Sequence, residues 1–241
     1  MQSVHIVSAY DEELKFLARK IAAMGGQAER MVDQAVAALV NGDPELGQRV
    51  IADDAQLDDA EREIDDKAIL IIARRQPMAK DLREVIGAIR ISADLERVGD
   101  LGKNIAKRVS AVAEGRQPNS LFRGLQALAE LALTQLKEVL DVYASRSVEK
   151  IGFVRDRDEQ IDAMYTSLFR ELLTYMMEDP RNITPCTHLL FVAKNIERIG
   201  DHATNIAETI YYIVTGEQMP PERPKEDESH RVTVSGGANP A

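Results

Sequence analysis

The chain has 241 residues, of which 44% are hydrophobic but only 5% aromatic, and it contains no tryptophan. This composition favours a helical bundle over a β-sandwich, because sandwich strands usually rely on aromatic and β-branched residues. The formal net charge of -10 at pH 7 would repel a phosphate backbone, so nucleic acid is excluded as an expected partner.

The start of the chain does not have the pattern of a secretion signal. Asp11, Glu12 and Glu13 lie where such a signal needs a basic and then an apolar stretch. No later apolar run approaches the ~20 residues that span a membrane. The sequence therefore predicts a cytoplasmic protein.

The first half of the chain predicts three helices. Apolar residues recur every three or four positions over residues 14–35, which is the spacing of a helix with one buried face, and an Asn-Gly-Asp-Pro segment at 41–44 ends this helix. A second helix is expected over about 45–75, where a Gln-Pro pair ends it because proline has no amide hydrogen. A third is expected over about 78–114. Short connections between long helices predict an antiparallel three-helix bundle over 8–115.

The second half of the chain repeats this pattern. A new apolar stripe starts at Leu121, and two more helices follow, with breaks at an Asp-Pro pair at 179–180 and at Gly216. A second three-helix bundle is therefore expected over 119–216. Residues 217–241 are rich in proline, charge and glycine, and this composition predicts a flexible tail.

The two bundles are related by internal duplication. The segment Leu-Glu-Arg-Val-Gly-Asp at 95–100 returns as Ile-Glu-Arg-Ile-Gly-Asp at 196–201, an offset of 101 residues. Upstream, Asp54 and Asp58 return as Asp158 and Asp162 at an offset of 104 residues. The sequence thus predicts an all-α fold made of two tandem three-helix bundles.

Each bundle carries two acid-x-x-x-acid motifs, one on its second helix and one on its third. Residues four apart share a helix face, so the like charges repel, and a sequence that repeats this arrangement four times predicts a bound cation. Asp54 and Asp158 also fall on apolar stripes, where an ionised carboxylate is costly without a partner. The eight candidate metal ligands are Asp54, Asp58, Glu96, Asp100, Asp158, Asp162, Glu197 and Asp201.

All-oxygen ligation suits hard cations such as magnesium, calcium, manganese or oxidised iron, but it does not identify the ion. Gly99 and Gly200 each precede a motif acid, and because glycine inside a helix costs about 1 kcal/mol relative to alanine, they predict a close approach by a neighbouring helix or by the ion's shell. Arg97 and Arg198 either hold the carboxylates or make surface ion pairs. His202 is interpreted as a helical histidine rather than a ligand.

The doubled Glu-Arg-x-Gly-Asp-x-x-x-Asn-Ile-Ala motif, together with the upstream Asp-x-x-x-Asp motif, resembles the PhoU family of phosphate-transport accessory proteins over about residues 8–216. The resemblance implies two three-helix bundles side by side, with multinuclear metal clusters on the acidic motifs, of iron or zinc in some members. With the hard cations considered above, the expected cofactor is a carboxylate-bound cluster of iron, zinc, manganese or magnesium.

The resemblance also implies a function. The chain would be a negative regulator of the phosphate-starvation response and of phosphate uptake, an adaptor between an ABC-type phosphate importer and a sensor histidine kinase. Its implied partners are the importer's ATPase subunit and the kinase, and it would meet the membrane only through them. A homodimer is also expected, since bundles commonly pair.

Two other hypotheses remain open. The chain could be a carboxylate-bridged metalloenzyme, although it lacks the Glu-x-x-His motif of di-iron bundle oxidases and any Gly-rich phosphate loop. It could also be a purely structural helical repeat whose acids are solvated and bind no ion. We expect a protein that is not an enzyme.

Overall fold

The computed structural model describes residues 2–113 and 119–219, and every regular element within these ranges is helical. The six long helices are α1 (Gln2–Asn41), α2 (Pro44–Arg75), α3 (Lys80–Ala106), α5 (Asn119–Ser145), α6 (Gly152–Glu178) and α7 (Ile183–Thr215). The short elements are α4 (Val109–Ala113), η1 (Val148–Lys150) and η2 (Pro180–Asn182). The predicted all-α fold is confirmed.

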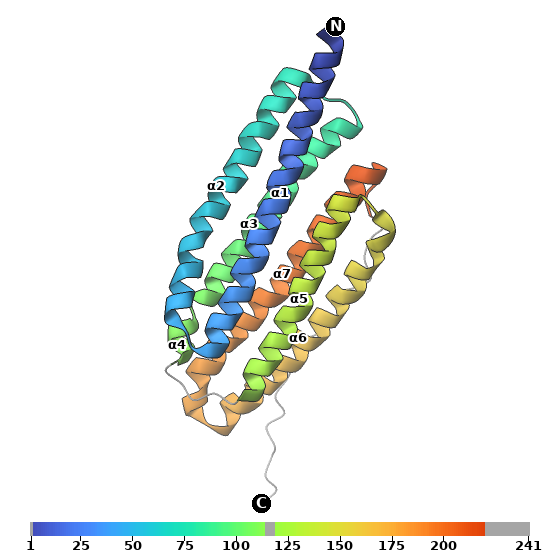
Figure 1. Cartoon of the computed structure of the whole chain (residues 1–241). Coiled ribbons are helices and arrows are strands. Elements are labelled where there is room, and N and C mark those ends of the chain that lie inside the picture. Colours follow the sequence, from blue (N-terminus) through green and yellow to red (C-terminus); the bar gives the residue numbers. More distant parts are fainter. Residues whose placement is uncertain (1, 114–118, 220–241) are drawn as a thin grey trace, which may run out of the picture.

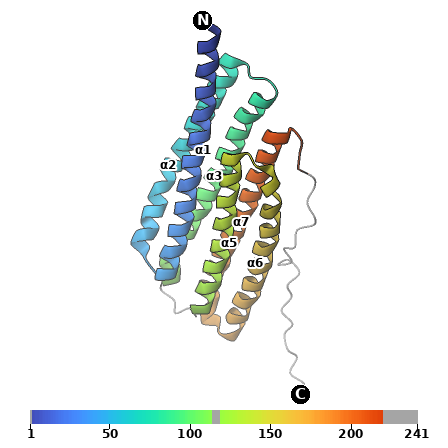
Figure 2. The same ribbon diagram turned by 45° about the vertical axis from the view of Figure 1, so that its right-hand side comes forward.

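The long helices form two three-helix bundles that lie side by side (Figures 1 and 2). Helices α1, α2 and α3 pack against one another in the first bundle, and α5, α6 and α7 do so in the second. The bundles meet where α3 packs on α7 and α1 packs on α5. The third helix of each bundle is therefore central, in contact with its own bundle and with the other.

Helix ends in the structure follow the predicted breaks. At the start of α2, the Asp43 side chain accepts a hydrogen bond from the backbone amide of Leu46 at 2.9 Å, which satisfies one of the free amides of the first turn. At its end, Gln76 is left-handed, with φ 49°. Gly216 ends α7 with φ 79°, a conformation that glycine adopts at little cost. The second helix predicted at 45–75 is confirmed.

The third helix differs from its prediction, which ran without a break to residue 114. It ends at Ala106, and a turn at Lys107 and Arg108 leads into the short α4. The amide of Arg108 bonds to the carbonyl of Ile105, three residues back, which tightens the chain locally. The apolar spacing continues through Val109, which is buried, so the sequence pattern carries no sign of this turn.

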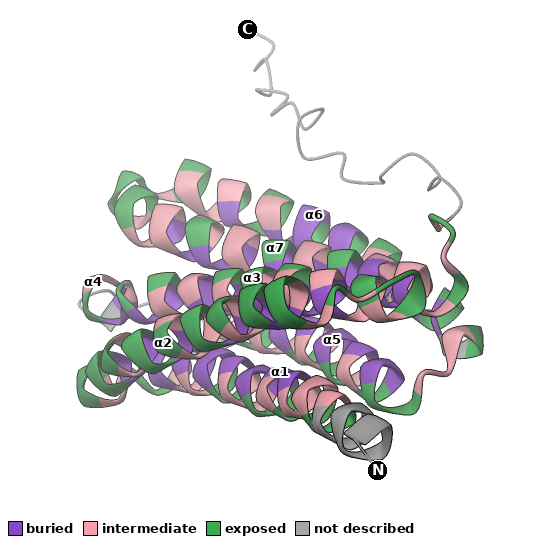
Figure 3. Ribbon diagram, turned by 90° about the horizontal axis from the view of Figure 1, so that it is seen from above, coloured by how far each residue is buried: buried purple, intermediate pink, exposed green. Residues whose placement is uncertain are grey.

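The apolar stripes of the six long helices face inward (Figure 3). Glycines allow the two bundles to approach closely. A Cβ atom on Gly87 of α3 would lie 2.6 Å from Cγ1 of Ile213 in α7, and one on Gly25 of α1 would lie 2.7 Å from Cδ1 of Leu140 in α5. The two contact lines between the bundles are therefore packed as tightly as an interior.

Polar contacts also join the two bundles. Glu84 of α3 pairs with Arg146, beyond the end of α5, at 2.6 Å. Arg108 lies 3.2 Å from the ring nitrogen of His188 in α7, and its guanidinium lies 4.4 Å from the ring centroid of Phe191. Side chains at both ends of α3 therefore hold it to the second bundle.

Of the described helices, none is both long and apolar enough to cross a membrane. Residues 220–241, which make up most of the predicted tail, lie outside the described ranges.

Candidate metal centres

The eight motif acids lie on the second and third helices of each bundle, and none of them is fully exposed. Asp54, Asp162 and Glu197 are buried, with exposed fractions of 8%, 3% and 3%. The half-buried acids are Asp58, Glu96, Asp100, Asp158 and Asp201. The acids are therefore not a freely solvated face, because each has given up part of its hydration and depends on contacts in the protein.

In the first bundle, the ammonium of Lys103 bridges carboxylates from two helices. It contacts Asp54 of α2, and its Nζ lies 2.6 Å from Oδ1 of Asp100, three residues earlier in α3. Burial alone would lower the pKa of Lys103, but hydrogen bonds to Asp100 and Asp54 outweigh it and raise the pKa above its ordinary value. The first bundle thus holds a permanent cation between two of its candidate ligands.

The remaining acids of this bundle concentrate negative charge. Burial raises the pKa of the Glu96 carboxyl, and the charge of Asp100 raises it further. Burial also raises the pKa of Glu61, as does the nearby charge of Asp65. Glu61 was not among the predicted ligands, although it lies one helical turn after Asp58. A cation that approaches this surface would relieve part of the repulsion.

Arg97 lies over these acids from the solvent side. Its Nε is 3.3 Å from Oε2 of Glu96 and its Nη1 is 3.3 Å from Oδ2 of Asp100, while its side chain is 60% exposed. Arg97 therefore makes surface ion pairs with motif acids of its own helix. Its counterpart Arg198 is also exposed.

The second bundle has a neutral hydrogen-bonded chain in the corresponding place. The hydroxyl of Thr204 in α7 donates to Oδ1 of Asp158 in α6 at 3.2 Å. The amide nitrogen of Gln135 in α5 donates to Thr204 at 3.1 Å and to the backbone carbonyl of Val154 at 3.0 Å. Gln135 is fully buried, and its Oε1 atom has no hydrogen-bond partner. The second bundle thus buries an amide side chain where the first bundle has the buried Met31 of α1, 104 residues earlier in the chain.

Glu197, the most enclosed acid of α7, pairs with Lys194 of the same helix at 2.7 Å. The Lys194 side chain is 41% exposed, and its Nζ lies 5.1 Å from the ring centroid of Tyr165. The ammonium of Lys194 therefore contacts Glu197 of its own helix and also lies over an aromatic ring of α6.

Gly99 and Gly200 mark close helix contacts beside the acids, as the sequence predicted. A Cβ atom on Gly99 would collide with Leu57 of α2, and one on Gly200 would lie 3.0 Å from Cδ1 of Ile161 in α6 and 3.1 Å from Oε1 of Gln135. A neighbouring helix therefore approaches closely at both glycines, which is one of the two causes that the sequence predicted.

The existing contacts of the candidate ligands limit how a metal ion could fit in either bundle. Within residues 2–113 and 119–219, no three acidic, histidine or cysteine side chains are grouped so as to hold one ion. In the first bundle, the position between Asp54 and Asp100 belongs to Lys103. In the second, Asp158 accepts a hydrogen bond from Thr204 and Glu197 pairs with Lys194, so an ion would have to replace these contacts. The eight ligands and the ion stay predictions.

His202 does not lie in a cluster of ligands. Its Nδ1 is 2.9 Å from Oδ1 of Asp94 in α3, and the amide of Asn205 lies 3.4 Å from the same oxygen. Both contacts cross from α7 to the first bundle. Asp94 and His202 thus belong to the junction between the bundles.

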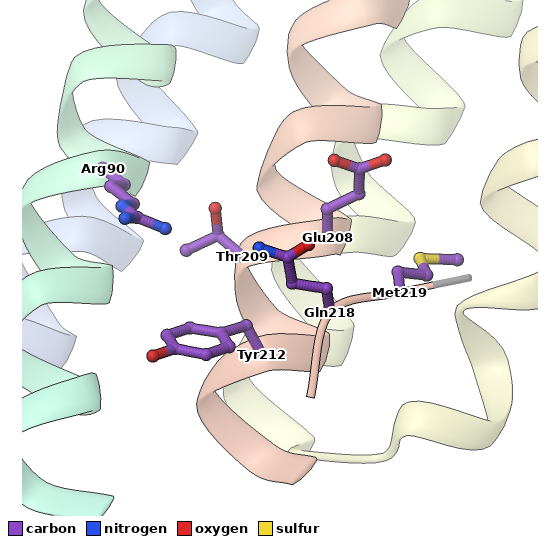
Figure 4. Close-up of a pocket in the computed structure, with 6 residues that line it drawn as sticks. All are labelled: Arg90, Glu208, Thr209, Tyr212, Gln218 and Met219. Carbon is purple, nitrogen blue, oxygen red and sulfur yellow. The ribbon is translucent and has the colours of Figure 1, made fainter. Parts of the chain in front are cut away.

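Two adjoining pockets lie in the groove between α3 and α7. The first, of about 370 Å³, has Arg90 of α3 on one side and Thr209 and Tyr212 of α7 on the other, with Gln218 and Met219 after the end of α7 (Figure 4). The second, of about 380 Å³, extends along α3 to Arg97. Among the described residues that line them, none is one of the eight candidate ligands. The groove therefore holds no candidate ligand, but it borders the acidic motif of α3 through Arg97, which pairs with Glu96 and Asp100.

Besides Glu61, the residues near the acidic motifs and the junction that the sequence did not single out include Lys103, Gln135 and Asp94. Lys103 had a signal, because it lies one turn after Asp100 and a basic residue there can reach the acid. Gln135 had one too, because it is a polar residue on the apolar stripe of its helix. Asp94 had no such signal, because in the sequence it cannot be distinguished from an exposed acid on a helix.

Comparisons with known proteins agree with this architecture. The model of the family described as "PhoU domain" matches the chain twice, over residues 21–109 and 125–210. The chain is 72% identical, over 94% of its length and 96% of the relative's, to a phosphate-specific transport system accessory protein PhoU homolog from Rhizobium meliloti. It is 49% identical to a protein of the same name from Caulobacter vibrioides, over 92% and 97% of the two chains.

Two solved structures share the fold. PhoU from Pseudomonas aeruginosa has a TM-score of 0.81 and 37% identity, over 86% of this chain and all of that one. A phosphate transport system regulatory protein PhoU from Streptococcus pneumoniae also has a TM-score of 0.81, with 28% identity over 88% of this chain and all of that one. The resemblance drawn from the two motifs is confirmed.

Proposed function

This chain belongs to the PhoU family, and we propose that it serves a phosphate-specific transport system as an accessory protein that restrains phosphate uptake and represses the phosphate-starvation response. The observation that carries the proposal is the twofold match of the family domain, which covers both bundles. The names of the similar proteins from Rhizobium meliloti and Caulobacter vibrioides support the link to phosphate transport.

In this proposal the chain is a cytoplasmic adaptor, not an enzyme, and its partners are the ATPase subunit of an ABC phosphate importer and a sensor histidine kinase. An adaptor needs a surface for protein contacts, and large apolar side chains are exposed around the α2–α3 turn. These are Ile69, Leu70, Met78 and Leu82, of which Met78 is 80% exposed. Grouped exposed apolar side chains favour a protein interface. The expected homodimer is checked by sedimentation of the purified chain.

Metal ions bound by the acidic motifs are the other part of the proposal. The burial of motif acids on paired helices supports it, because a buried carboxylate needs a cation or donors. The ion would fix the spacing of the second and third helices of a bundle and so shape the surface that partners contact. Its chemistry would be electrostatic: it would neutralise carboxylates and order bound water.

A repression assay in cells tests the regulatory proposal. In a bacterium that lacks its own copy of the gene, the wild-type chain should silence a phosphate-starvation reporter in phosphate-rich medium. The double variant Met78→Asp/Leu82→Asp should lose this silencing and its co-purification with the kinase, while the purified protein keeps its helical circular dichroism. Phe153→Asp is the matched control, because Phe153 is also exposed but lies at the start of α6. A wild-type chain that leaves the reporter fully active contradicts the proposed function.

A further inference from the structure

The internal duplication relates two sets of contacts along the packing of α3 on α7. At the offset of 101 residues, Gly87 of α3 corresponds to His188 of α7, and Arg108 after α3 corresponds to Thr209 of α7. The Arg108 guanidinium lies 3.2 Å from Nδ1 of His188. The counterparts also meet, because a Cβ atom on Gly87 would lie 3.6 Å from Cγ2 of Thr209. The two bundles therefore form two equivalent grooves, one near each end of α3.

Side chains fill the groove near the end of α3. The guanidinium of Arg108 lies 4.4 Å from the ring centroid of Phe191 in α7, and it also contacts His188. A guanidinium over an aromatic ring gains both packing and the attraction between the charge and the ring. The chain itself therefore occupies this groove.

The equivalent groove near the start of α3 contains different side chains. Thr209 stands in place of Arg108, so no guanidinium enters from α7, and Arg90 stands in place of Phe191. The two adjoining pockets, of about 370 and 380 Å³, lie here, and Arg90 and Thr209 line both of them. The open space therefore corresponds to the place that Arg108 fills in the other groove.

Arg90 presents a positive charge to the open groove. Its guanidinium lies 6.0 Å from the ring centroid of Tyr212, and among the described residues it forms no ion pair with a carboxylate. The guanidinium points into the pocket, whereas the carboxylate of Glu208 lies on the far side of it (Figure 4). Asp94, which lines the second pocket, already accepts a hydrogen bond from His202. The N–H groups of Arg90 are therefore the charged donors that the groove offers to a ligand.

We propose that this groove binds a small organic anion, whose carboxylate or phosphate group pairs with the guanidinium of Arg90. A guanidinium holds such a group through two parallel hydrogen bonds. The hydroxyl of Thr209 and the amide of Gln218 line the same pocket and can bond to the rest of the ligand. Each pocket also falls within the volume range of small-molecule sites. A ligand here touches both bundles, so its binding should favour the packing of α3 on α7.

Isothermal titration calorimetry of the full-length protein tests the proposal with three probes: citrate, glycerol 3-phosphate and inorganic phosphate. Citrate or glycerol 3-phosphate should bind saturably, and inorganic phosphate should bind more weakly. Arg90→Gln should weaken binding at least about tenfold, because a charge-assisted pair is lost. Arg90→Lys keeps the charge but not the paired donors, so its loss should be smaller. Arg198→Gln is the matched control, since Arg198 is exposed on α7 and is not among the described residues that line either pocket.

A second variant closes the groove with the chain's own solution. Arg90→Phe/Thr209→Arg copies the pair of Phe191 and Arg108 into the open groove, and it should abolish binding while circular dichroism shows an unchanged helical content. If this variant binds citrate or glycerol 3-phosphate as tightly as wild type, the site lies elsewhere and the proposal is wrong. Failure of both organic probes to bind the folded wild type also overturns it. Inorganic phosphate that binds as tightly as the organic probes would show a site for the bare ion instead.

Discussion

Asp94 of α3 accepts a hydrogen bond from His202 of α7, with 2.9 Å between Oδ1 and Nδ1, and this contact joins the two bundles. A carboxylate can only accept, so the ring nitrogen must carry the hydrogen. Both side chains are less than one fifth exposed. The pair lies midway along the α3–α7 contact, where it fixes how one bundle is placed against the other.

The first prediction concerns this pair. Asp94→Ala leaves the half-buried imidazole of His202 without its acceptor, so the free energy of unfolding in urea should fall by about 1–2 kcal/mol. Asp94→Asn keeps an acceptor oxygen and should lose less than half as much. His202→Ala should cost little once Asp94 is already alanine, because contacting residues are not additive. Equal losses for Asp94→Ala in the wild type and in the His202→Ala background would contradict the contact.

A second prediction concerns the glycine between the bundles. In Gly87→Ala, the new Cβ would lie 2.6 Å from Cγ1 of the buried Ile213, so one helix must shift. Overpacking of this kind costs roughly 1–3 kcal/mol, of which the better helix propensity of alanine returns about 1. We expect thermal unfolding at a lower temperature than wild type. Ile213→Val in the same chain should restore part of the loss.

Gly26→Ala is the matched control for that substitution. Gly26 also lies inside a helix, but its new Cβ would meet only Nη1 of Arg30, at 3.5 Å. With no clash, the propensity gain remains, and stability should rise by roughly 0.5–1 kcal/mol. The change in stability should therefore have opposite signs in Gly87→Ala and Gly26→Ala. A loss of stability in both variants would contradict a specific clash at Gly87.

Much of the fold could be predicted because its signals are local and repeated. Each pattern involves only residues that are close together in the sequence. These patterns are the apolar periods of the helices and the breaks at 41–44, 179–180 and Gly216. The turn at Lys107 and Arg108 could not be predicted, because it lies within an unbroken apolar period. It depends on tertiary contacts, since Arg108 packs on an aromatic ring of the other bundle.

The acidic motifs were predictable for the same reason, since spacing and duplication are visible in the sequence. The difference between the bundles was not, because it depends on which side chains meet across helices. Lys103 reads in the sequence as one more basic residue on an acidic helix, and only the packing of α3 on α2 brings it to Asp54. The pairing of Asp94 with His202 likewise needs the packing of one bundle on the other.

A third prediction follows from Glu13, which ties α1 to α2. Its carboxylate accepts from Arg75 at 2.8 Å and from Lys67 at 3.1 Å, and its side chain is 18% exposed. The hydrogen bond from Arg75 is the main cause that holds the pKa of Glu13 below its ordinary value. A lowered folded pKa gives stability that is present above the unfolded pKa and is lost as the pH falls through the folded pKa.

Glu13→Gln should therefore reduce the free energy of unfolding by about 1–2 kcal/mol at pH 7, and the difference from wild type should shrink as the pH falls below about 4. Urea unfolding at several pH values measures this. Glu12→Gln is the adjacent control, since Glu12 is exposed and pairs only within its own helix with Lys15, so no measurable change is expected. A Glu13 effect that persists unchanged at pH 3 would contradict the ionic origin.

The final prediction exchanges the central side chains of the two bundles in the metal-free protein. Gln135→Met removes a buried acceptor that has no partner, and it introduces a side chain of similar volume that the first bundle already uses at Met31. The lost hydrogen bonds to Thr204 and to the carbonyl of Val154 offset this gain, so the free energy of unfolding should change by less than about 1 kcal/mol. The reverse change, Met31→Gln, buries an amide among apolar neighbours and should cost about 1–3 kcal/mol. Urea unfolding of both variants measures the contrast, and if Gln135→Met proves the more damaging of the two, the buried amide stabilises the second bundle without any ion.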